Sequence, residues 1–148
     1  MEATYFMGVA NAIASVMPLF YIGKVGRKPI FVIGHLAIAL AMLFCGFSID
    51  NQWNTSSLIM IILMIFAFHM STGTMCWVYV PEVCIDRAMG VVVAFQALNL
   101  TIVVFSFEFM INSALQVHGT FWYFSAINFL ATLFCLFFVK ETRGLTDL

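Results

Sequence analysis

The sequence predicts an all-α membrane protein with five transmembrane helices, and three observations support this fold class. First, 64% of the 148 residues are hydrophobic and only 9% are charged, whereas roughly a quarter of the residues of a water-soluble domain are charged. Second, five apolar segments approach the roughly 20 residues that a helix needs to cross a bilayer. Third, every Lys and Arg lies in alternate connectors between these segments or in the tail, which is typical of a multi-pass membrane protein.

Each segment is continuously apolar, so its backbone groups must be satisfied internally and helices are favoured over barrel strands. The first segment ends before a basic turn, and the second begins at Pro29, which suits a first helical turn because it lacks an N–H group. The third follows the polar residues 54–56, the fourth follows Arg87, and the fifth stops before Lys140. The predicted helices span about residues 4–22, 29–49, 57–79, 89–111 and 120–139, and a tail covers 140–148.

The connectors predict the orientation in the membrane. The basic residues lie in the connector 23–28, in the connector 80–88 and in the tail: Lys24, Arg27, Lys28, Arg87, Lys140 and Arg143. The loops 50–56 and 112–119 contain neither Lys nor Arg. By the positive-inside rule the N-terminus lies outside and the C-terminus is cytoplasmic, with the plasma membrane as the default location. The sequence leaves open which membrane it is and whether the sequon at Asn54 is glycosylated.

Composition and motifs also exclude several classes of function. A net charge of −1 offers no basic surface for nucleic acid. The four cysteines contain no CxxC pair, and their spacing indicates neither a metal site nor a disulfide framework. The sequence contains no phosphate-binding loop and no nucleophile–base pair. We therefore expect no enzyme activity, no cofactor and no metal, and the bilayer is the first partner to be expected.

Three motifs stand in order at the predicted cytoplasmic ends of the helices: "GKVGRKPI", "WVYVPEVCIDRAMG" and "VKETRGLT". Together they resemble the C-terminal half, helices eight to twelve, of sugar porters in the major facilitator superfamily. That group includes the glucose facilitators and the xylose–proton symporter. The resemblance covers essentially the whole chain and implies a partial C-terminal six-helix bundle of the major facilitator fold. It also implies transmembrane transport of a hexose-type sugar by alternating access, with or without a coupled proton.

The resemblance further implies a cytoplasmic charge network that gates the transporter. Its candidate members are Gly26, Arg27, Lys28, Glu82, Arg87, Glu141 and Arg143. Gly26 permits a tight turn between helices, and a guanidinium can bind a carboxylate through two hydrogen bonds. Glu82 and Arg87 are expected to pair with Arg27 and Glu141. The alternative is that these charges only anchor helix ends among the lipid head groups, because exposed ion pairs are individually weak.

Several positions depart from the family pattern. Gly23 stands where the family has an acidic residue, Met89 replaces an expected Arg, and Lys140 replaces an expected Pro. Thr74 stands where the family usually has a helix-breaking proline. These departures weaken the expected charge network or hinge, while the fold does not depend on them. Gly73, one residue earlier, is the candidate hinge.

Polar side chains within apolar helices are candidates for substrate binding. Asn11, fifteen residues before Gly26, matches the substrate-binding Asn of the family's helix eight. Trp77, five residues before Glu82, matches the sugar-flanking Trp of helix ten. His69 occupies the position of a sugar-contacting residue in the glucose facilitators, and Asn99 resembles the amide of helix eleven.

Each of these residues also has an interpretation without a ligand. Asn11 and His69 could instead bond neighbouring helices. Trp77 could belong to an interfacial aromatic belt. Gln96 could take the role of Asn99, which is one residue out of register with the family.

Alternating access requires two repeated halves around a midplane site, and this sequence accounts for less than one half. We therefore expect the chain to act as part of a sugar porter, with the missing N-terminal helices of the same transporter as a partner. One alternative is another solute carrier of the superfamily, and a second is a non-transporting truncated membrane protein. Which sugar is carried, and whether by uniport or proton symport, stays open.

Overall fold

The computed structural model describes residues 2–20 and 24–142, and within these ranges all side chains except those of residues 2, 3, 19, 86 and 87. Every regular element in this part of the chain is helical, which confirms the predicted all-α fold class. The elements are α1 (Glu2–Val16), the short 3₁₀-helix η1 (Met17–Phe20), α2 (Arg27–Asp50), α3 (Asn54–Phe68), the π-helix η2 (His69–Gly73), α4 (Thr74–Val83), α5 (Asp86–Ile111) and α6 (Gln116–Phe138).

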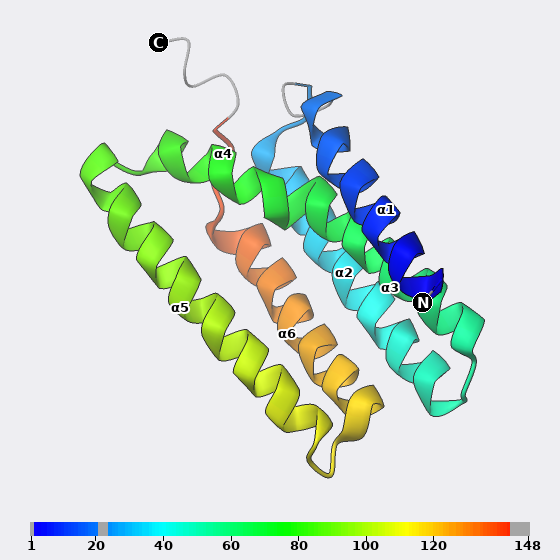
Figure 1. Ribbon diagram of the computed structural model, residues 1–148. Helices are drawn as coiled ribbons and strands as arrows, with labels where there is room; N and C mark the ends of the chain where they lie inside the picture. The colour runs from blue at the N-terminus through cyan, green and yellow to red at the C-terminus, as the bar shows by residue number, and fades with distance from the viewer. Residues whose placement is uncertain (1, 21–23, 143–148) are drawn as a thin grey trace.

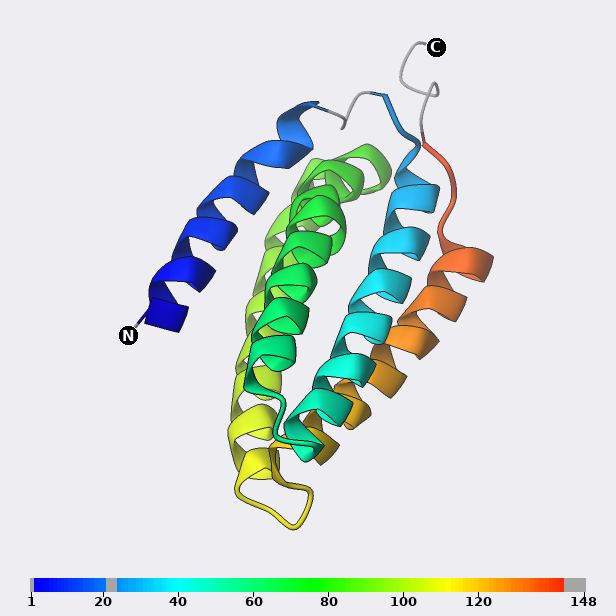
Figure 2. The ribbon, with the colours of Figure 1, turned by 90° about the vertical axis from the view of Figure 1, so that its right-hand side faces the viewer.

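Among the described residues, four helices are long and apolar enough to cross a membrane by length and composition. These are Arg27–Asp50, Asn54–Val83, Ala88–Ile111 and Gln116–Phe138. The apolar stretch of α1, Thr4–Val16, is shorter, although the 3₁₀-helix η1 continues the chain to Phe20. The third crossing differs most from its predicted range of 57–79. It begins at Asn54 and reaches Val83, because α3, η2 and α4 follow one another without a break as one helical segment (Figures 1 and 2).

Helix α2 is the centre of the bundle, with α6 along one side and α3 along another (Figures 1 and 2). Small polar residues of α6 are buried in this packing, and the Ser125 hydroxyl donates a hydrogen bond of 2.7 Å to the Ala39 carbonyl of α2. Small and hydroxyl-bearing residues are favoured between membrane helices because they let the backbones approach. Helix α1 packs on α3 and η2, whereas α5 contacts mainly α6.

The π-helix η2 interrupts the third crossing where the sequence predicts a hinge at Gly73. Two hydroxyls satisfy carbonyls in and next to the widened turn: Ser71 donates to Ala67 O at 2.6 Å, and Thr74 donates to His69 O at 2.9 Å. Single π turns inside helices recur at functional sites. The irregularity therefore lies at the predicted place, although Thr74 replaces proline there. Movement about Gly73 stays a prediction.

The turn before α2 and the segment after α6 meet at one end of the bundle, beside α4 (Figure 1). A compact apolar cluster lies beneath them, formed by Ile30, Phe31, Met75 and Cys135 from three different helices. The Phe31 and Tyr79 rings meet edge to face with centroids 5.6 Å apart. This packing brings the three predicted cytoplasmic connectors together.

Candidate functional site

An ion pair joins α2 to α4 at this end of the bundle. Arg27 Nη2 lies 2.7 Å from Glu82 Oε1, and Arg27 Nε lies 3.2 and 3.3 Å from the two carboxylate oxygens. Only 16% of the Arg27 side chain and 15% of the Glu82 side chain are exposed. A guanidinium that engages both oxygens fixes the relative orientation of the two helices as well as their separation.

Glu141 caps the start of α2. Its carboxylate accepts hydrogen bonds from the backbone N–H groups of Arg27 at 2.8 Å and Lys28 at 3.2 Å. Gly26 is the N-cap residue and supplies no side-chain bond of its own. A Cβ atom at Gly26 would overlap the Glu141 carboxylate, so glycine is required for this docking. A negative charge at a helix N-terminus is also favoured by the helix dipole.

Thr142 is a member of this cluster that the sequence analysis did not single out. Its hydroxyl donates a short hydrogen bond to Glu82 Oε2, and only 8% of the residue is exposed. A hydroxyl next to the candidate Glu141 was a usable signal. We call Gly26, Arg27, Glu82, Glu141 and Thr142 the connector cluster, since they join the starts or ends of three crossings.

The remaining predicted members of the charge network are placed differently. Lys28 contributes its backbone N–H group to the cluster. The side chain of Arg87 and the whole of Arg143 lie outside the described part of the structure. The pairing of Arg87 with Glu141 and the membership of Arg143 in the network therefore stay predictions.

Two of the four candidate substrate residues contact each other. His69 Nε2 of η2 lies 2.6 Å from Asn11 Oδ1 of α1. Because an amide oxygen only accepts, the imidazole Nε2–H is the donor in this bond. Both side chains border a cavity of about 250 Å³ whose other walls come from α2 and α3. The Asn11 amide nitrogen and His69 Nδ1 make no hydrogen bond within the described part of the chain, so both can meet a polar ligand.

Trp77 and Asn99 lie apart from that pair. Trp77 is half exposed on α4. Asn99 is exposed on α5, and its amide donates to Phe95 O of the same helix at 2.9 Å. Gln96, the alternative to Asn99, is also exposed on α5. The described residues therefore contain an Asn11–His69 pair, with no hydrogen bond from the other two candidates to it.

His35 and Asn128 also escaped the sequence analysis, although both are polar residues inside apolar helices. Their side chains lie 3.2 Å apart, between α2 and α6. The rule that intramembrane polar residues are functional candidates would have found them. The resemblance drew attention to other positions instead.

Comparison with known proteins decides the family. The family model of "Sugar (and other) transporter" matches residues 1–147. The chain belongs to this family. The D-xylose-proton symporter of Escherichia coli K12 is 33% identical over 97% of this chain and 31% of its own length. The glucose transporter GlcP of Staphylococcus epidermidis is 31% identical over 93% of this chain and 32% of its own length.

Solved structures of the same family share the fold. The inward-open structure of the E. coli xylose transporter XylE matches with a TM-score of 0.87 and 30% identity, over 96% of this chain and 33% of that one. Another structure of this major facilitator symporter, bound to 6-bromo-6-deoxy-D-glucose, matches with a TM-score of 0.82. The predicted resemblance to sugar porters and the partial major facilitator bundle are confirmed. This member of the sugar transporter family spans about a third of the length of the curated relatives it matches.

Proposed function

We propose that this chain forms helices eight to twelve of a transporter that carries a hexose-type sugar across the plasma membrane by alternating access. The observation that carries the proposal is the connector cluster in a chain of this family. Arg27 links α2 to α4 through Glu82, and Glu141 and Thr142 tie the tail to both. The names of the relatives, which refer to xylose and glucose, support a sugar as the substrate.

In this proposal the cluster keeps the cytoplasmic side closed when the site faces outward. Breaking the Arg27–Glu82 pair releases α4 from α2 and lets the cytoplasmic ends separate. Arg87 and Arg143 add positive charge to the same network. The concentration of basic residues in the connectors and the tail supports an external N-terminus and a cytoplasmic C-terminus.

The Asn11–His69 pair supplies the polar part of the proposed sugar site. Its free amide N–H groups and imidazole nitrogen can donate to and accept from sugar hydroxyls. The indole of Trp77 offers an apolar face for a sugar ring, and Asn99 contributes from α5 when the site is assembled. The N-terminal helices of the transporter are the proposed partner that closes the other side of the cavity.

Uptake of labelled D-xylose and D-glucose tests this proposal. The full chain is expressed in cells without endogenous uptake, together with the first seven helices of the E. coli D-xylose-proton symporter. Uptake above that of either part alone is expected, and Asn11→Leu should abolish it. The symporter's own helices eight to twelve, supplied in the same way, are the positive control. If that control transports and this chain does not, the proposed function is wrong.

A further inference from the structure

A chain of hydrogen bonds within the membrane region connects α6, α2 and η2. His35 of α2 is its centre: Nδ1 lies 3.2 Å from Asn128 Oδ1 of α6, and Nε2 lies 3.3 Å from Thr72 Oγ1 of η2. These residues are 93 and 37 positions away from His35 in the sequence. The contacts therefore belong to the tertiary structure and hold three separate elements in register.

The neighbouring bonds assign a direction to this chain. The Asn128 amide nitrogen donates to Phe124 O at 2.9 Å, which leaves Asn128 Oδ1 to accept. His35 therefore donates from Nδ1, and in the neutral imidazole Nε2 is the acceptor. The Thr72 hydroxyl then donates to His35. The side chains of Asn128, His35 and Thr72 are thus hydrogen-bonded in one consistent arrangement. This matters in a region of low dielectric constant, where an unpaired polar group is costly.

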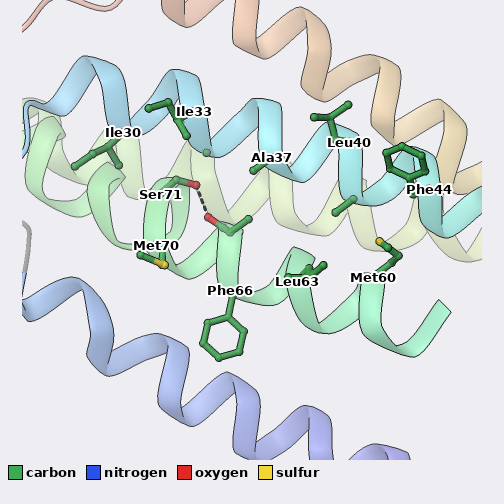
Figure 3. A pocket seen from close by; sticks show the side chains of 13 residues that line it. Ile30, Ile33, Ala37, Leu40, Phe44, Met60, Leu63, Phe66, Met70 and Ser71 are labelled. Carbon is green, nitrogen blue, oxygen red and sulfur yellow. Dashed lines mark hydrogen bonds between the residues drawn. The ribbon is translucent and has the colours of Figure 1, made fainter. Parts of the chain in front are cut away.

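The backbones of α2 and η2 also approach closely beside this chain. A Cβ atom at Gly34 would overlap the Ser71 side chain and lie 3.4 Å from Ser71 Cα. Ser71 lines an apolar groove of about 640 Å³ whose other walls come mainly from α2 and α3 (Figure 3). Its hydroxyl donates a hydrogen bond back to the Ala67 carbonyl. Ser71 thus fills the gap at Gly34, while its neighbour Thr72 makes the polar bond to α2.

The π turn sends two side chains of η2 to different neighbours. In an α-helix, residues three positions apart lie on one face. Within η2, His69 bonds Asn11 of α1, whereas Thr72 bonds His35 of α2. The wider π turn separates their directions, and the Thr72–His35 bond holds one side of the same turn that carries His69.

We propose that His35 is a positioning residue: the Asn128–His35–Thr72 chain holds the π-helical turn in the rotation that aims His69 at Asn11. His35 itself touches no substrate in this arrangement. It links the packed helices α2 and α6 to the Asn11–His69 pair, which borders the cavity of about 250 Å³. The claim that this rotation sets the affinity for sugar rests on the proposed function. The claim that His35 positions His69 does not.

Nitrogen NMR of the imidazoles tests the positioning directly, because the chain contains only three histidines. The full chain, labelled with ¹⁵N-histidine, is placed in lipid nanodiscs. Thr72→Val removes the hydroxyl at nearly constant volume and should shift the nitrogen signals of both His35 and His69. Thr72→Ser keeps a hydroxyl and should leave His69 close to its wild-type position. His35→Leu should shift the His69 signals in the same direction as Thr72→Val.

Thr120→Val is the matched control. Thr120 is fully buried, and its hydroxyl bonds Gln116 O of its own helix, so the His69 signals should not move. The proposal is overturned if Thr72→Val leaves the His69 signals unchanged, or if Thr120→Val shifts them equally.

Adding D-xylose to the same samples separates this inference from the proposed function. A sugar-dependent shift of His69, with an apparent affinity several-fold weaker in Thr72→Val than in Thr72→Ser, supports both. If sugar moves no His69 signal while Thr72→Val still does, the positioning stands and sugar binding by this chain fails. If sugar shifts His69 with equal affinity in both Thr72 variants, the link from positioning to affinity is wrong.

Discussion

Helices α2 and α5 are both long and apolar, yet they are packed in opposite ways. Buried residues make up 44% of the most apolar 18-residue stretch of α2 and none of the corresponding stretch of α5. The buried face of α2 contains small residues such as Gly34, Ala39 and Gly46. Helix α5 instead presents large side chains outward, including Phe105 and Phe109, which are 68% and 77% exposed.

This difference in burial shows that the sequence determines membrane insertion and helix packing through different features. Apolar length alone places a helix in the bilayer, because lipid tails and Leu or Phe side chains are equally apolar. Small residues and hydrogen bonds then decide which helices touch. Substitutions of similar size should therefore lower the free energy of unfolding strongly on α2 and hardly at all on α5.

The largest effect is expected at Gly34. A side chain there collides with Ser71, so Gly34→Leu should lower the free energy of unfolding by about 3 kcal/mol through overpacking. Within the described part of the chain, a Cβ atom at Gly90 of α5 would meet no packing neighbour within 4 Å, so Gly90→Leu should change the free energy of unfolding by less than about 0.5 kcal/mol. Denaturant unfolding in mixed micelles measures both. Equal losses at the two glycines would contradict the comparison.

The next effect concerns the ion pair of the connector cluster, formed by Arg27 and Glu82. Glu82→Gln removes the charge that holds Arg27 and should cost about 2 kcal/mol, since hydrogen bonds to charged groups contribute roughly 1.5–3 kcal/mol. Glu108 of α5 is exposed and makes no ion pair among the described residues, so Glu108→Gln should be almost neutral. The same unfolding assay measures both variants.

A double-mutant cycle of Glu82→Gln with Arg27→Gln isolates the pair itself. The double variant should lose much less than the sum of the two single variants. Strict additivity would show that the two side chains do not stabilise the fold through each other.

Much of the fold could be predicted because bilayer thickness and the positive-inside rule act on short stretches of sequence. The pairing of Arg27 with Glu82 was also within reach, since opposite charges at the same membrane face have few other partners. The π turn at His69 was not, because it lies in a contact between two helices, where Gly34 of α2 leaves room for Ser71. The hydrophobicity pattern of one segment does not predict a contact with a particular residue of another helix.

For the candidate substrate residues, too, the sequence predicts the depth of a residue better than its contacts with other helices. Depth in the membrane follows from residue counting, and Asn11 and His69 do meet. The direction of a side chain around its helix depends on the packing of neighbours, which is why Asn99 bonds its own backbone on the exposed helix α5. Thr142 stands directly after Glu141 in the motif VKETRGLT, and it was overlooked because the expected network was built mainly on charged side chains.

A smaller effect is expected at Gly26. Gly26→Ala should displace the Glu141 carboxylate from the start of α2 and cost about 1 kcal/mol, the usual value of a helix cap. Among the described residues, a Cβ atom at Gly8 of α1 would meet no packing neighbour within 4 Å, so Gly8→Ala is the matched control and should be neutral or slightly stabilising. Protease cleavage of the tail reports the displacement. Faster cleavage is expected in Gly26→Ala and in Glu141→Gln, and wild-type rates in both would show that the cap does not hold the tail.

The smallest effect returns to the packed pair α2–α6. Ser125→Ala removes the hydrogen bond to Ala39 O and should cost about 0.6 kcal/mol, the average for polar contacts between membrane helices. Thr101→Val on α5 is the comparison, because within the described residues that exposed hydroxyl bonds only Ala97 O of its own helix. Its loss should not affect packing, so unfolding should be unchanged within error. If Ser125→Ala is equally silent, then close backbone approach alone specifies the α2–α6 contact, and hydrogen bonding across it contributes nothing measurable.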